Sequence, residues 1–103
     1  MTAPQGRWRH SFEEDHDGIT VYRPESYTFP PARGRGGVEF GPDGGFIDWG
    51  PGAADVPQGR HGFWSGTPDL EKLEVTVGDR HRVLDVVSYQ PDKLELRIHE
   101  ETP

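Results

Sequence analysis

"QGRWRHS" (5–11) and "QGRHGFWS" (58–65) each place a tryptophan, Trp8 or Trp64, two residues after a glycine. Glycine lets a strand bend or approach its neighbour closely, and a tryptophan two residues later on the same face can fill the interior of a small barrel. The shared Gln-Gly-Arg stands at a different distance from the tryptophan in each stretch, so we interpret it as coincidence rather than duplication. Both stretches are therefore predicted to be strands of one barrel.

Short runs of alternating apolar and polar residues occupy most of the chain around these two stretches. Gly or Pro interrupts nearly every window that could form a helix before Leu70, and turn sequences such as Asp17-Gly18 separate the runs. We predict an all-β fold in a single domain (1–103), a small eight-stranded antiparallel up-and-down barrel. The predicted strands are 7–13, 19–23, 37–41, 46–49, 60–65, 73–77, 82–89 and 94–99.

Two of the predicted connections are long, 24–36 and 50–59. In an up-and-down meander the connections alternate between the two ends of the barrel. These two join the second strand to the third and the fourth to the fifth, so we expect them at the same end, where they would cover one mouth.

The composition argues against several classes of partner and chemistry. Asp and Glu number 18 against 11 Lys and Arg, so nucleic acid and anionic membranes are not expected partners. The chain has no cysteine, which excludes disulfides and thiolate chemistry. The first residues contain no apolar run that could be a signal peptide, and no segment is apolar enough to span a bilayer as a helix, so we expect a cytoplasmic protein.

The chain resembles the lipocalin and calycin group of barrels. The residues that carry the resemblance are "GRW" (6–8), "GFW" (62–64) and the stretch "HSFEED…VYRP…FPPARGR" (10–35), which is similar to small bacterial proteins of that kind. The resemblance implies an eight-stranded barrel with an interior ligand site. Lipocalins set an arginine of the last strand against the first tryptophan; here Arg97 is available, but it alternates with the apolar residues and is expected to point outward.

His10 is the sharpest candidate for chemistry. It shares its strand face with Trp8 and Phe12, so it is expected inside the barrel, where a neutral imidazole could act as a base, a hydrogen-bonding group for a ligand, a metal ligand or a structural residue. Arg23 shares a face with Val21 and could clamp a ligand carboxylate or pair with Glu13 or Glu14. Asp85 could then pair with Arg23 or orient His10.

Two other patterns favour ordinary structural roles. The acidic turn "EEDHDG" (13–18) resembles the start of a calcium loop but lacks the later ligands, and the histidines have no zinc-binding spacing, so neither metal nor cofactor is expected. "RGRGG" (33–37) is one copy of an RNA-binding pattern in an acidic chain, and ion-paired arginines are the better interpretation.

Three functional interpretations follow, and the sequence leaves all three open. The leading one is a barrel that binds a small apolar molecule. The second is a compact enzyme of the cyclase or isomerase type in which His10 or a carboxylate moves a proton, and the third is a protein-interaction module that uses Tyr27 and Phe29 of the loop 24–36. A homodimer is left open as well. The expected ligand-binding residues are Trp8, His10, Phe12, Val21, Tyr22, Arg23, Phe40, Trp64, Asp85 and Tyr89, and the wider lumen lining adds Val38, Phe63 (as the alternative to Trp64), Val75, Val87 and Leu96.

Overall fold

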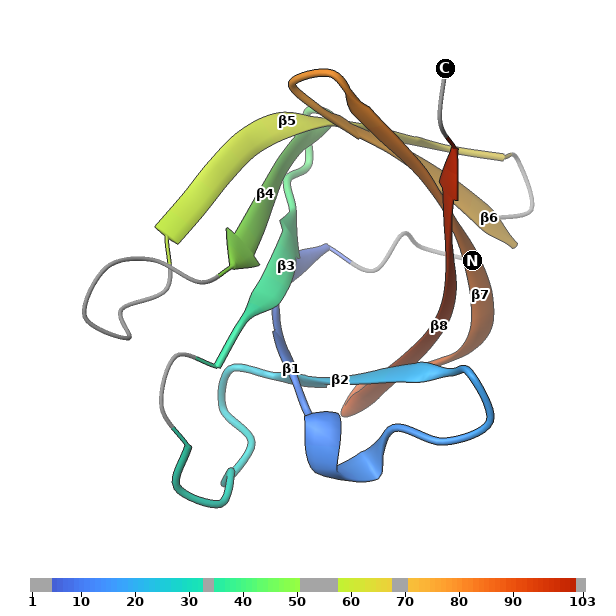
Figure 1. Cartoon of the computed structure of the whole chain (residues 1–103). Helices are drawn as coiled ribbons and strands as arrows, with labels where there is room; N and C mark the ends of the chain where they lie inside the picture. Colours follow the sequence, from blue (N-terminus) through green and yellow to red (C-terminus); the bar gives the residue numbers. More distant parts are fainter. Residues whose placement is uncertain (1–4, 33–34, 51–57, 68–70, 102–103) are drawn as a thin grey trace.

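The computed structural model describes residues 5–32, 35–50, 58–67 and 71–101. Eight strands form a closed barrel in which every neighbouring pair is antiparallel, and Figure 1 looks into the ring that they make. The predicted closed, eight-stranded antiparallel barrel is thus confirmed. The strands are β1 (Gly6–His10), β2 (Thr20–Pro24), β3 (Gly37–Phe40), β4 (Gly45–Gly50), β5 (Gln58–Gly66), β6 (Lys72–Val77), β7 (Arg80–Gln90) and β8 (Lys93–Glu101).

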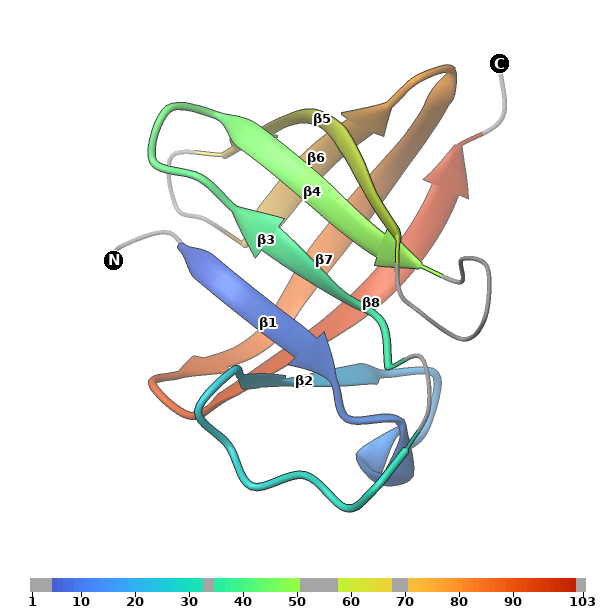
Figure 2. The same cartoon turned by 90° about the vertical axis from the view of Figure 1, so that its left-hand side faces the viewer.

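The order of the strands departs from a pure up-and-down meander at one place. From β3 to β8 each strand pairs with the next, but it is β2, not β1, that pairs with β8, and β1 pairs with β3. The chain must therefore cross β1 between β2 and β3, and Figure 2 shows the described residues 25–32, which we call the crossing segment, passing below β1. The first long connection leaves β2 at Pro24, which is paired with Trp8 of β1. Most of the second, 51–57, lies outside the described residues, so the expectation that the two connections cover one mouth stays a prediction.

The first strand is shorter than predicted. It ends at His10, and Phe12–Glu14 form a 3-10 turn, η1, instead of continuing the strand. The Glu14 backbone N–H donates to Ser11 O at 2.9 Å, and the Ser11 hydroxyl donates to the Glu14 carboxylate at 2.7 Å. A Ser-x-x-Glu sequence favours such a turn. The predicted hairpin turn at Asp17 and Gly18 is present, since both residues have positive φ.

The lumen is packed with apolar side chains over much of its length. The buried cluster consists of Trp8, Tyr22, Val38, Phe40, Phe46, Leu73, Val75, Leu84, Leu94 and Leu96, with Trp64, Val77, Val86, Tyr89 and Ile98 packed against it. Rings from strands that are not neighbours meet inside, for example Trp8 and Tyr89, whose centroids lie 5.9 Å apart. This packing accounts for the stability of the barrel from a sequence with few apolar residues.

The two glycines of the Gly-x-Trp stretches serve different purposes. Gly6 has a φ of +100°, which a residue with a side chain rarely adopts. At Gly62 the neighbouring strand comes so close that a Cβ would lie 2.0 Å from the Thr76 carbonyl oxygen. Trp8 and Trp64 both contact the buried cluster, as predicted.

Several predicted orientations are wrong. On β2 it is Tyr22, not Val21 and Arg23, that joins the core, because Tyr22 stands opposite Leu94 of β8. Val21 is buried outside the core cluster, on the face of β2 that it shares with Arg23. Two further residues expected in the lumen face outward, with exposed fractions of 48% for Phe12 and 48% for Val87. Of the alternatives Phe63 and Trp64, it is Trp64 that packs against the core, and Phe63 is 74% exposed.

Candidate functional site

An ion pair crosses the interior of the barrel. Asp48 of β4 stands opposite the core residue Val38, and Arg82 of β7 stands opposite the core residue Val75, so both side chains share the lumen face. The Arg82 Nη2 donates to Asp48 Oδ2 at 3.0 Å. Since β5 and β6 separate these two strands in the wall, the contact spans the lumen. The pair is largely shielded, with side-chain exposed fractions of 15% for Arg82 and 19% for Asp48.

Arg82 forms fewer hydrogen bonds than Arg23 and Arg35, two other arginines whose side chains are at most 15% exposed. Arg23 and Arg35 each form a bidentate pair with a glutamate and donate further to backbone carbonyls. Arg82, by contrast, donates only the hydrogen bond to Asp48 within the described residues. Its other nitrogens are not among the buried atoms that lack a partner, so they reach solvent-accessible space. A guanidinium carries several N–H donors in a fixed fork, and most of this fork is therefore available.

Tyr22 of β2 stands opposite His10, the last residue of β1. Burial raises the pKa of the Tyr22 phenol far above its ordinary value; Asp48 and Asp15 also raise it, and Arg82 acts against them. The phenol is therefore neutral at every physiological pH. Its hydroxyl forms no hydrogen bond with any residue that the structure describes, and it is not shut off from solvent.

His10 lies beside Tyr22, with ring centroids 5.5 Å apart, and is held by a carboxylate. Its Nε2 lies 2.8 Å from Asp15 Oδ2, while Asp15 Oδ1 accepts the backbone N–H of Val21 at 2.9 Å. The orienting carboxylate is thus Asp15, and the prediction that Asp85 fills this role is wrong. The His10 side chain is 33% exposed at the end of β1, so the lumen does not enclose it as the sequence predicted. We call His10, Tyr22, Asp48 and Arg82 the lumen cluster.

Arg23 has a structural environment outside the lumen. It pairs with Glu14 through two hydrogen bonds of 2.8 and 2.7 Å, as one of the two sequence interpretations predicted, and its guanidinium lies 4.7 Å from the Tyr27 ring centroid. Arg35 forms the equivalent pair with Glu13 at 2.8 Å. These hydrogen bonds lower the pKa of each glutamate from 4.5 to about 2. The arginines fasten η1 to β2 and to the crossing segment.

The aromatic rings of the crossing segment take part in the same arrangement. Tyr27 and Phe29 meet edge to face at 4.9 Å, and Arg35 stacks at 4.6 Å from the Phe29 centroid. Arg35 is ion-paired, as expected for the Arg-Gly-rich stretch, whereas Arg33 lies outside the described residues. The interaction-module interpretation would use the Tyr27 and Phe29 rings to bind a partner. The contacts above show that these rings also hold the crossing segment in place.

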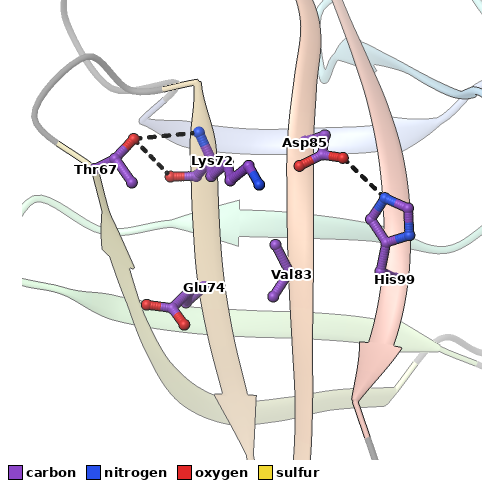
Figure 3. Close-up of a pocket in the computed structure, with 6 residues that line it drawn as sticks. All are labelled: Thr67, Lys72, Glu74, Val83, Asp85 and His99. Carbon is purple, nitrogen blue, oxygen red and sulfur yellow. Dashed lines mark hydrogen bonds and ion pairs between the residues drawn. The ribbon is translucent and has the colours of Figure 1, made fainter.

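Asp85 lies in a groove on the outer face of the barrel. The groove has a volume of about 500 Å³ and is lined by Thr67, Lys72, Glu74, Val83, Asp85 and His99. Figure 3 shows Asp85 turned toward His99 of β8, and the His99 Nε2 lies 2.8 Å from Asp85 Oδ2. Asp85 therefore contacts neither Arg23 nor His10.

The sequence predicted part of the lumen cluster and missed the rest. His10 and Tyr22 were expected in the site, and Trp8, Phe40, Trp64 and Tyr89 lie in or against the core beside it. Asp48 and Arg82 were missed. Alternation could have indicated them, because Asp48 follows the buried Phe46 by two residues and Arg82 precedes the buried Leu84 by two.

The described residues include no group of three or more His, Cys, Asp or Glu side chains that could hold a metal ion. Among the same residues no helix is long and apolar enough to cross a membrane. Arg97 was expected to point outward, and it does: the residue is exposed and stands opposite Asp85.

No family model matches the chain, and no curated protein or solved structure matches it either.

Proposed function

We propose that this barrel binds one small, mostly apolar molecule in its lumen, with the lumen cluster as the polar contacts. The observation that carries the proposal is the Arg82–Asp48 pair, which bridges the interior at 3.0 Å and leaves most of the guanidinium fork unused. An interior that served stability alone is better filled with apolar side chains, because replacing a buried ion pair by well-packed apolar residues is often neutral or stabilising.

The residues that line the lumen support the same proposal. Eight strands enclose a space that side chains just fill or that holds one small ligand. Packed rings of Trp8, Phe40 and Phe46 provide an apolar surface, and the lumen cluster adds a few polar groups. Small-molecule sites combine these two elements, a mostly apolar lining and a small number of placed polar groups. A lipocalin-like relationship and a bacterial origin agree with this proposal and stay predictions.

Four of the residues first expected to bind the ligand are not part of this proposal. Phe12 and Arg23 face the outside around η1, Val21 is buried beside them outside the core cluster, and Asp85 lines the outer groove. Trp8, His10, Tyr22, Phe40, Trp64 and Tyr89 remain, joined by Asp48 and Arg82.

Native mass spectrometry of the protein purified from its own host tests the proposal. We expect an added small mass that denaturation removes and that is lost in the variant Arg82→Gln. Arg97→Gln is the matched control, because Arg97 is an exposed arginine of β8 that stands opposite Asp85, away from the lumen. Bare protein in every preparation, together with no binding of apolar dyes by the folded wild type, would overturn the proposal.

One observation favours the second candidate, a proton-transfer enzyme. The His10–Asp15 pair resembles an acid–base pair in its geometry, since a fixed carboxylate orients an imidazole. His10→Ala separates the two candidates: the enzyme requires that turnover of a bound compound is lost while binding is kept. Unchanged turnover in this variant excludes His10 as the catalytic base.

A further inference from the structure

We infer that the polar group of the ligand is a neutral edge that carries a hydrogen-bond donor beside an acceptor, as in a primary amide or a lactam. This inference rests on the proposed function, because it names the chemical class of ligand for the same lumen site. It follows from the charges and the unused hydrogen-bonding groups of the lumen cluster.

The charges of the lumen cluster favour a neutral group on the ligand. Asp48 already compensates Arg82, and the N–O distance between them is 3.0 Å. A ligand carboxylate would gain from the guanidinium but would have to lie against the Asp48 carboxylate. A ligand ammonium group would gain from the Asp48 carboxylate but would have to lie against the Arg82 guanidinium. Like charges in a shielded site repel strongly because the effective dielectric constant there is low, so a neutral group fits best.

Arg82 and Asp48 both keep hydrogen-bonding groups that their mutual contact does not use. Arg82 has unused donors, and the Asp48 Oδ1 accepts no hydrogen bond from the described residues and is not among the buried unpartnered atoms. The cluster therefore presents donors next to an acceptor. A primary amide offers the complementary pair, with its C=O for Arg82 and its N–H for Asp48.

Tyr22 adds to this selection without changing the charge. Its burial keeps the phenol neutral, so its hydroxyl can donate or accept according to the ligand. Tyr22 belongs to the buried cluster that fills the same lumen.

A series of ligands with one apolar body tests the inference. Octanamide, octanoate and N,N-dimethyloctanamide share a chain of the same length, but only octanamide has a neutral donor and acceptor together. Isothermal titration calorimetry of the wild-type protein should show octanamide binding at least about tenfold more tightly than either of the others, since leaving a shielded group unpaired costs on the order of 1 to 3 kcal/mol.

Two variants sharpen the test by changing the charge. Asp48→Asn leaves Arg82 uncompensated, so the preference should turn toward octanoate. Arg82→Gln should weaken octanoate further and lower the affinity for octanamide, and Arg97→Gln should leave the wild-type ranking unchanged. Thermal melting curves check that each variant folds, and the wild-type ranking alone decides the question if a variant does not.

The possible outcomes separate the inference from the proposed function. Tightest binding of octanoate or of the dimethylamide by the wild type overturns the inference, and the proposed function stands. An unchanged ranking in a folded Asp48→Asn protein also overturns it. If none of the three compounds binds, the inference falls, and a bare protein in the mass-spectrometric experiment then removes the proposed function as well.

Discussion

Arg82 and Asp48 form the one described ion pair that joins β7 to β4, and it does so through the lumen rather than along the wall. Two intervening strands, β5 and β6, separate the residues in the sheet. The pair therefore marks the side of β4 and of β7 that faces inward, and it places two charged side chains among apolar neighbours.

Breaking this pair should destabilise the barrel. Asp48→Ala leaves the shielded Arg82 uncompensated, so we expect the free energy of unfolding to fall by up to about 3 to 5 kcal/mol. Replacing both residues by apolar ones, as in the double variant Asp48→Leu/Arg82→Met, should recover most of this loss. Urea denaturation measures both. A double variant as unstable as Asp48→Ala would contradict the interpretation that the pair serves a purpose other than stability.

The two glutamate–arginine pairs predict how stability depends on pH. Hydrogen bonds from Arg35 and Arg23 lower the pKa of Glu13 and Glu14 from 4.5 to about 2. A carboxyl with a lowered folded-state pKa stabilises the fold above its unfolded pKa, and this contribution is lost as the pH falls through the folded pKa. The melting temperature should therefore fall between about pH 4.5 and pH 2.

The double variant Glu13→Gln/Glu14→Gln provides the control for that prediction. It should melt at a lower temperature than the wild type at pH 7 and should show a shallower decrease in acid. Parallel melting curves for the two proteins from neutral pH to pH 2 would show that these pairs do not set the acid response.

The Gly62 position should not accept a side chain. A Cβ at Gly62 would lie 2.0 Å from the Thr76 backbone oxygen, so Gly62→Ala should lower the free energy of unfolding by at least about 2 kcal/mol. Gly50→Ala is the matched control, because a Cβ there meets only the end of the flexible Arg60 side chain, at 3.3 Å. Equal urea midpoints for the two variants would mean that the close approach of β5 and β6 is not present.

The neighbours Phe63 and Trp64 test which face of β5 points inward. Trp64 packs against the core and its indole N–H donates to the Gly41 carbonyl at 2.9 Å, whereas Phe63 is exposed. Trp64→Ala should cost about 3 to 5 kcal/mol, and Phe63→Ala less than about 0.5 kcal/mol. Denaturant titrations of both variants check this, and a larger cost at Phe63 would reverse the assignment of the two faces.

The sequence predicted the barrel because alternation and turn chemistry are local properties. The hairpin at Asp17 and Gly18 and the inward face of β8, with Leu94 and Leu96, could be read from short windows. The ring order could not, since nothing local distinguishes β1 from β2 as the partner of β8. The face of β2 was assigned wrongly because Val21 is buried as well, although it lies outside the core cluster.

The candidate site was only partly predictable for a related reason. His10 and Tyr22 are adjacent across β1 and β2 and were expected in the site. Asp48 and Arg82 lie 34 residues apart and meet only when the sheet closes, so their pairing depends on the closed ring rather than on any local pattern. The same holds for Asp15, which reaches His10 because the chain turns at η1.

Two-dimensional amide NMR during a titration with octanamide tests the central claim most directly. The account predicts saturable shifts that centre on His10, Tyr22, Asp48 and Arg82, with little change at Lys72 and His99 of the outer groove. Shifts confined to the outer groove, or none at saturating ligand for octanamide, octanoate and the dimethylamide alike, would contradict it.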